Sequence, residues 1–176
     1  QVGELDYFSE NFYLFNDNLK KLKEFCEYHI EKYVKNVLNP VDDLDFYITT
    51  SWLNVVKPGG LINRHNHANS LISGTFYPKT VEEDTVCFHD PNLQRRIHRE
   101  CIAIPNISQE ASSIRPYSEN IEASLLAIND GDLLLFPSWL SHGVLPNEKA
   151  TTDRISISFN VFVRGNIGGQ GTLSEL

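Results

Sequence analysis

The sequence predicts a mainly β protein, a sandwich or barrel of short strands that follows one N-terminal helix. One stretch near the N-terminus has helical periodicity, and from residue 44 onward short aromatic and β-branched segments alternate with turn signals. Many short strands joined by turns pack as a sandwich or close into a barrel. Because no internal repeat or linker divides the chain, we expect one domain over residues 1–176, helical in 1–40 and strand-rich in 44–163.

An amphipathic helix is predicted over residues 17–38. Its apolar positions recur at threes and fours, which makes a stripe: Leu19, Leu22, Phe25, Cys26, Ile30, Tyr33, Val34 and Val37. Asn16 or Asp17 can cap its start, and Asn39-Pro40 ends it. The lysines and glutamates between the apolar positions form a solvated face, so we expect the helix to pack on the outside of a sheet.

The segments that follow have the composition of strands. They cover residues 46–56, 71–77, 86–88, 125–128, 132–136 and 154–163. Turn signals separate them, among them Lys57-Pro58-Gly59-Gly60 and Asn129-Asp130-Gly131. In the last segment Arg154, Ser156, Ser158 and Asn160 alternate with apolar residues, which predicts one face in a polar interior. Residues 92–120 are polar and irregular, as in a long insertion or lid.

The bulk composition restricts the class of protein. A formal net charge of −8 argues against nucleic acid or an anionic membrane as the main partner. No apolar run reaches the roughly 20 residues that cross a bilayer, and no signal peptide is recognisable. Three cysteines without a CxxC spacing favour a reducing, cytoplasmic setting. The chain begins at Gln1 and contains no methionine, so we expect residues to be missing before it.

Three histidines and one arginine form the pattern most typical of a functional site. His65 and His67 stand at positions i and i+2, which face the same side of a strand. His142 follows an apolar strand and a Pro137-Ser138 turn, so it can project from the mouth of a barrel and complete a metal site. Arg154 begins the next strand and can hold the carboxylate of an acidic co-substrate. The pattern favours a non-haem metal oxygenase.

These segments together resemble the Fe(II)- and 2-oxoglutarate-dependent oxygenases, most of all their small prolyl-hydroxylase-like group of bacteria and phages. The resemblance covers about residues 46–163. It rests on Trp52, Asn54, His65, His67, Ser73, Gly74, Phe76, Tyr77, Phe136, Pro137, His142, Pro146, Arg154, Ser156 and Asn160. It implies a double-stranded β-helix, the jelly roll shared with cupins, in a cytoplasmic protein of a bacterium or a phage-infected cell.

The resemblance also implies a reaction and a set of cofactors. The site would hold Fe(II) and 2-oxoglutarate, react with O2 and couple decarboxylation of 2-oxoglutarate to hydroxylation of a prime substrate, with ascorbate as a reductant. Arg154 would bind the distal carboxylate of 2-oxoglutarate, and Tyr77 and Asn54 are further candidates for its binding. The sequence does not identify the prime substrate, which is a protein side chain or a small molecule.

The sequence departs from the wider family at one ligand. The usual first motif is His-x-Asp, and His67 stands where the carboxylate belongs, with Asn66 and Asn69 as alternative ligands nearby. Replacing an anionic ligand by neutral imidazole raises the charge of the metal centre by one. This change weakens the stabilisation of higher iron oxidation states and favours other divalent metals.

Other interpretations remain open at this stage. Arg154 can instead form a structural ion pair with Asp153, Asp132 or Glu148. A cupin enzyme or metal-binding protein with three histidine ligands would not use 2-oxoglutarate; its motifs are met at both histidine segments, but the usual glutamate is replaced by Leu71 and Ile72. A catalytically inactive jelly-roll module could bind a partner through residues 92–120.

Overall fold

The computed structural model describes residues 7–8, 15, 17–40, 44–89, 123–168, 171–172 and 174–175. The segment 92–120, interpreted above as an insertion or lid, lies outside the described residues. Within them, none of the helices combines the length and the apolar character that crossing a bilayer requires.

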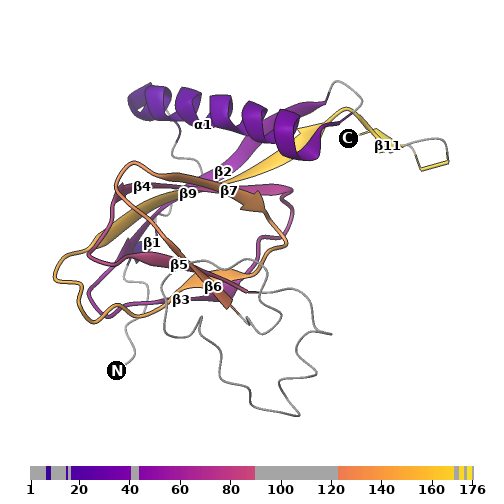
Figure 1. Cartoon of the computed structure of the whole chain (residues 1–176). Helices are drawn as coiled ribbons and strands as arrows, with labels where there is room; N and C mark the ends of the chain where they lie inside the picture. Colours follow the sequence, from indigo (N-terminus) through magenta and orange to yellow (C-terminus); the bar gives the residue numbers. More distant parts are fainter. Residues whose placement is uncertain are drawn as a thin grey trace, which may run out of the picture.

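Two antiparallel sheets face each other and enclose the interior of a jelly roll (Figure 1). The larger sheet has the order β1-β2-β9-β4-β7, with the bounds Tyr7–Phe8, Asp45–Val56, Arg154–Arg164, Ile72–Lys79 and Leu133–Pro137. The smaller has the order β3-β8-β5-β6, with the bounds Ile62–His65, His142–Val144, Thr85–His89 and Ala123–Ala127. The predicted fold class, a mainly β jelly roll after one helix, is confirmed.

The helix lies across the outer face of the larger sheet, as its apolar stripe predicts (Figure 1). It consists of a 3-10 turn Asp17–Leu19, α1 Lys20–Tyr33 and a π-helical end Val34–Leu38. Asn39 ends it in the left-handed conformation at φ 44°, which asparagine tolerates well. The predicted cap at Asp17 is wrong, because the 3-10 turn moves the cap position to Leu19, which makes no side-chain capping bond.

The main core lies between the helix and the larger sheet. Its buried members are Phe15, Cys26, Ile30, Ile48, Ile72, Ile157, Phe159 and Val161. The alternate residues of β9 face the other way: Arg154, Ser156 and Ser158 are buried and line a pocket between the two sheets. The prediction that this strand has one face in a polar interior is therefore confirmed.

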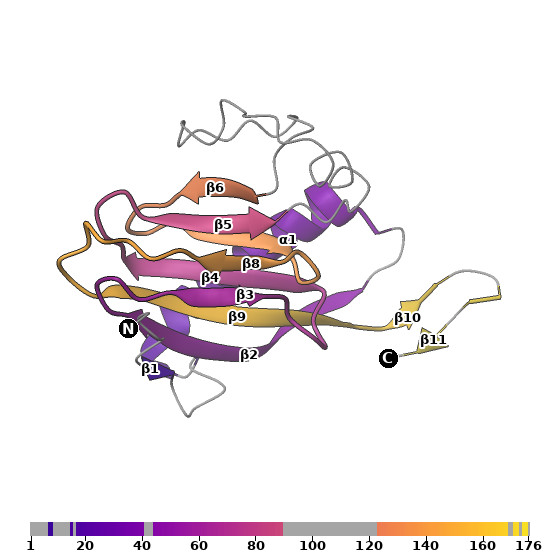
Figure 2. The ribbon, with the colours of Figure 1, turned by 90° about the horizontal axis from the view of Figure 1, so that it is seen from below.

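Two strands, β3 and β8, lie outside the segments predicted from composition; a strand was expected at His65 and His67 from their spacing alone, and β3 ends at His65. The sequence of β3, Ile-Asn-Arg-His, is largely polar, and β8 has only three residues, so neither has the composition of a strand. Figure 2, seen from the opposite side to the helix, shows them side by side in the smaller sheet. Beyond β9, a short antiparallel ladder joins β10 Asn166–Ile167 with β11 Ser174–Glu175.

Gly74 provides a test of the packing in the larger sheet. It lies opposite Phe159 in the β4–β9 ladder, and a Cβ atom at this position would overlap the phenylalanine ring. The ring is fully buried and cannot move aside freely. We expect Gly74→Ala to lower the free energy of unfolding by about 1–3 kcal/mol in urea denaturation. Phe159→Leu in the same chain should recover part of this loss; strictly additive effects would contradict the predicted overlap.

Candidate metal centre

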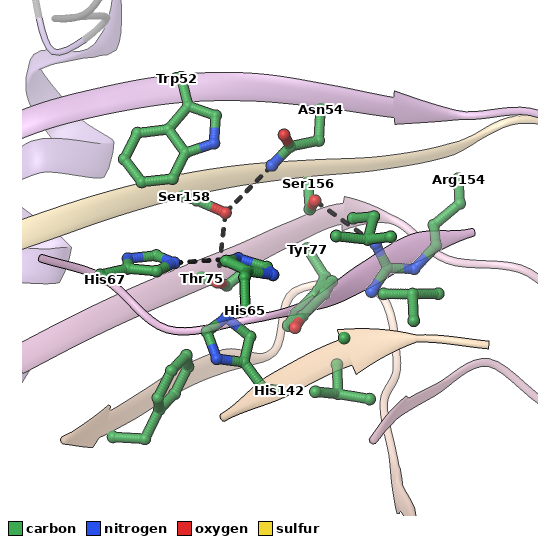
Figure 3. Close-up of a pocket in the computed structure, with 15 residues that line it drawn as sticks. Trp52, Asn54, His65, His67, Thr75, Tyr77, His142, Arg154, Ser156 and Ser158 are labelled. Carbon is green, nitrogen blue, oxygen red and sulfur yellow. Dashed lines mark hydrogen bonds between the residues drawn. The ribbon is translucent and has the colours of Figure 1, made fainter. Parts of the chain in front are cut away.

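Three imidazoles meet at one end of the pocket between the sheets. His65 ends β3 and lies directly opposite His142, the first residue of β8, in the antiparallel ladder. His67 lies two residues beyond β3, where its backbone N–H donates to the carbonyl of Ser138 at 3.0 Å. One ligand nitrogen of each ring lies within 4.8 Å of the others. The structure thus brings the three predicted histidines together, as Figure 3 shows.

The hydrogen bonds of two rings determine which nitrogen is free. Nδ1 of His65 lies 2.8 Å from the carbonyl oxygen of Asn63, and Nδ1 of His142 lies 2.9 Å from that of Leu140. A carbonyl oxygen only accepts hydrogen bonds, so each Nδ1 must carry the proton. In the neutral rings Nε2 therefore presents a lone pair. Such a carbonyl bond behind the ligand atom is typical of metal-binding histidine.

His67 is held by side chains instead of a carbonyl. Its Nδ1 lies 2.6 Å from Oδ1 of Asn160 and 2.9 Å from Oγ of Ser73. Asn160 uses its Nδ2 to donate to Oγ1 of Thr50 at 3.1 Å, which leaves Oδ1 facing the imidazole as an acceptor. The amide oxygen thus also requires a proton on Nδ1 of His67.

A chain of serine hydroxyls leads to the same tautomer. Oγ of Ser70 donates to the carbonyl of Ile72 at 3.0 Å, and Oγ of Ser138 donates to Ser70 at 2.7 Å. A hydroxyl has one proton to donate, so the 2.9 Å bond between Ser73 and Ser138 must use the proton of Ser73. Ser73 can then only accept from His67. The chain begins at a backbone carbonyl and ends by fixing the ligand tautomer of His67.

The donor set fits a divalent first-row metal ion. Nε2 of His65 and Nε2 of His67 are 3.2 Å apart, and two lone pairs at this distance repel unless a cation lies between them. Nitrogens at about 2.0–2.1 Å from one ion, roughly 90–110° apart, would be about 2.8–3.4 Å from each other. Burial lowers the pKa of His142 to about 4 and also lowers the pKa of His67. Both rings are thus neutral near pH 7, as ligation requires.

A pocket of about 450 Å³, its open mouth included, extends from the imidazoles to Arg154. Tyr77 lies between the two ends (Figure 3) and is 1% exposed. Burial raises its pKa to about 12, so the phenol keeps its proton and can donate a hydrogen bond. Asn54 is buried and donates to Oγ of Ser158 at 3.1 Å. At the metal end, the ring of Trp52 lies 5.5 Å from that of His67.

Arg154 forms a buried ion pair, the alternative left open in the sequence analysis, but with a partner that the sequence did not predict. Its Nε donates to both carboxylate oxygens of Asp84 at 3.0 and 2.9 Å, and both side chains are less than 5% exposed. The expected partners are wrong: Asp153 pairs with Lys57 at 2.7 Å, and Asp132 accepts from the backbone of Asn129. Burial raises the pKa of Asp84, and the guanidinium acts against that rise.

Sequence reasoning missed Asp84 because it lies in a turn 70 positions before Arg154. Nothing in that turn distinguishes it from its neighbours Glu82 and Glu83. Ser138 was also missed as a support for the ligands, since a serine after a proline reads as an ordinary turn residue.

The comparisons with known proteins agree with this geometry. A family model described as "Putative 2OG-Fe(II) oxygenase" matches residues 50–160, a range that contains all three histidines and Arg154. The chain belongs to this family. No curated protein matches the sequence.

Solved structures with a similar fold include members of the same superfamily. One is the non-heme alpha ketoglutarate dependent epimerase SnoN from nogalamycin biosynthesis, with 11% identity, a TM-score of 0.56 and coverage of 90% of this chain and 63% of that one. Another is HygX from Streptomyces hygroscopicus with nickel, 2-oxoglutarate and hygromycin B bound, with 13% identity, a TM-score of 0.54 and coverage of 89% and 70%. At these identities the likeness concerns the fold.

This chain spans only about half the length of a third solved structure that it matches. That structure is a 2OG-Fe(II) oxygenase family oxidoreductase from Burkholderia pseudomallei, with 10% identity and a TM-score of 0.47. The match covers 76% of this chain but only 56% of that one.

A substitution at Asn160 tests whether its hydrogen bond to His67 contributes to metal binding. Asn160→Leu removes the acceptor of His67 Nδ1, so we expect the affinity for Co(II) or Zn(II), measured by titration of the metal-free protein, to fall by roughly 10–100-fold. His142→Ala should abolish tight binding, whereas His29→Ala, on the outer helix, should leave it unchanged. An unaltered affinity in Asn160→Leu would show that the amide does not position the ligand.

Proposed function

We propose that the protein is a non-haem Fe(II) and 2-oxoglutarate-dependent dioxygenase of the hydroxylase type, with His65, His67 and His142 as the iron ligands. One observation carries the proposal: three imidazoles converge at one end of a pocket that has a buried guanidinium at its other end. Bound iron would supply the activation of O2 that couples decarboxylation of 2-oxoglutarate to hydroxylation. Ascorbate would serve as reductant, and the prime substrate is a protein side chain or a small molecule.

In this proposal Arg154 binds the distal carboxylate of 2-oxoglutarate. Its Nε is engaged by Asp84, so the terminal Nη1–Nη2 edge is the one that can meet a carboxylate in the two-point geometry that guanidinium favours. Ser156 lies 3.5 Å from Nη1, and Tyr77 supplies a protonated hydroxyl in the same part of the pocket. These three side chains orient the co-substrate so that its 2-oxo acid end faces the imidazoles.

The same donor set supports a second candidate, a three-histidine cupin enzyme that does not use 2-oxoglutarate. All the ligand candidates are neutral nitrogen donors, and Arg154 already has an anionic partner in Asp84. Such a protein would bind a metal ion without needing a 2-oxo diacid.

An anaerobic titration separates these functions. The metal-free protein receives Fe(II) and then 2-oxoglutarate while its visible absorption is recorded. We expect a charge-transfer band that requires both additions, because a 2-oxo acid chelating protein-bound iron produces such a band. Iron binding without the band would favour the three-histidine cupin. Absence of metal binding would leave an inactive jelly-roll module.

A substitution at Arg154 tests whether 2-oxoglutarate binds at this end of the pocket. Arg154→Ala should raise the 2-oxoglutarate concentration at half-maximal band intensity by roughly 30-fold or more, since a buried carboxylate would lose its charged partner. Arg164→Ala is the matched control, because this arginine ends the same strand and stacks on Tyr47, outside the pocket.

The substitution also leaves Asp84 buried without its cation, which threatens the fold. The same change is therefore made in an Asp84→Asn background, with thermal unfolding as the check. If Arg154→Ala leaves the 2-oxoglutarate concentration at half-maximal band intensity unchanged in both backgrounds, Arg154 has a structural role and does not bind the co-substrate.

A further inference from the structure

We propose that Asp84 is the charge-balancing and positioning residue of the co-substrate pocket, and that it compensates for the absence of a carboxylate among the metal ligands. The inference rests on the proposed function. It concerns a residue that does not line the pocket and acts through Arg154.

The argument begins with the charges of the pocket. Among the described residues that line it, Arg154 is the only lysine, arginine, aspartate or glutamate. The three histidines are neutral ligands, so they leave a divalent ion its full charge. Ion and guanidinium together would place three positive charges in one largely buried space. With Asp84 the sum is two, and a dianionic 2-oxo diacid brings it to zero.

Asp84 is held where this charge is effective. It is 4% exposed, its backbone N–H donates to the carbonyl of Val81 at 3.1 Å, and its carbonyl accepts from Ile128 at 3.1 Å. Both carboxylate oxygens face Nε of Arg154. The backbone of Asp84 is therefore fixed in the turn, and its carboxylate is enclosed beside the guanidinium.

The ion pair also orients the guanidinium. A carboxylate bound at Nε fixes the plane of the group, because the guanidinium is rigid and its donors have fixed directions. Arg154 also makes a cation–π contact with Tyr77, with the guanidinium carbon 5.1 Å from the ring centroid. Asp84 thus determines which edge of Arg154 is available to a ligand, in addition to its effect on charge.

The charge balance predicts compensation between two distant positions. His67→Asp would add a negative charge at the metal, which leaves the loaded pocket one unit less positive. Asp84→Asn makes it one unit more positive while preserving the size of the side chain. If total charge governs binding, the two changes together should cancel. A unit charge in a pocket of this size alters the affinity for an ion by roughly tenfold.

The experiment measures two affinities in four proteins: wild type, Asp84→Asn, His67→Asp and the double variant. The first is for Co(II), by titration of the metal-free protein; the second is for 2-oxoglutarate, by anaerobic calorimetry on the Fe(II)-loaded protein. We expect Asp84→Asn to weaken Co(II) binding and His67→Asp to weaken 2-oxoglutarate binding, each by roughly tenfold. The double variant should return toward wild type in both.

Glu83→Gln is the matched control. This acid precedes Asp84 in the same turn but is exposed and pairs with Lys149 at 2.7 Å, so its removal should change neither affinity. Thermal unfolding of each metal-free variant excludes a loss of fold as the cause.

The outcomes separate the inference from the function on which it rests. Unchanged Co(II) affinity in Asp84→Asn, together with no recovery in the double variant, would overturn the role of Asp84. Failure of the wild type to bind 2-oxoglutarate would overturn the proposed function; a roughly tenfold loss of Co(II) affinity in Asp84→Asn would then still support charge balance at the metal.

Discussion

The pairing of β9 with both β2 and β4 is the constraint on which the rest of the molecule depends. β9 lies between β2 and β4 in the larger sheet, and its alternate side chains face the hydrophobic core on one side and the pocket on the other. Phe159 and its neighbours on one face complete the core under the helix, while Arg154 and the serines on the other face line the pocket. A shift of one residue in this register would exchange the two faces, so the fold cannot change here without losing the site.

The polar interior is stabilised because its groups satisfy one another. Ser73 and Ser138 are completely buried, and each finds hydrogen-bond partners within a chain that starts at a backbone carbonyl. A buried hydroxyl without a partner would cost about 1–3 kcal/mol. Each hydroxyl has one proton to donate, so the bond from Ser70 to the backbone carbonyl determines the direction of every further hydrogen bond in the chain. His67 is at the end of this chain, and its protonation pattern follows from the fold itself.

Local patterns predicted the elements in which an apolar face alternates with a polar face. The stripe of α1 and the alternation in β9 were readable because each contrasts an apolar with a polar face. The meeting of His65, His67 and His142 also followed from alternation and from the turn before His142, although His67 lies beyond the end of its strand. The bounds of β3 and β8 were not predictable from composition, because their pairing with each other and with the rest of the smaller sheet determines them more than their own residues do.

The ion pair of Arg154 shows where sequence reasoning ends. Which acidic residue lies beside Arg154 in the fold depends on the register of several strands. Many acidic residues are present in the sequence, and only that register brings Asp84 to Arg154. Yet its importance follows from a change that the sequence does display, the histidine in place of a ligand carboxylate. Under the proposed function the pocket would hold a cation and a dianion, and their binding would depend on its total charge, whichever residue supplies the balancing one. Under that proposal, with no carboxylate among the metal ligands, a buried acid beside the pocket would supply the balancing charge, and Asp84 in the β4–β5 turn can do so through Arg154.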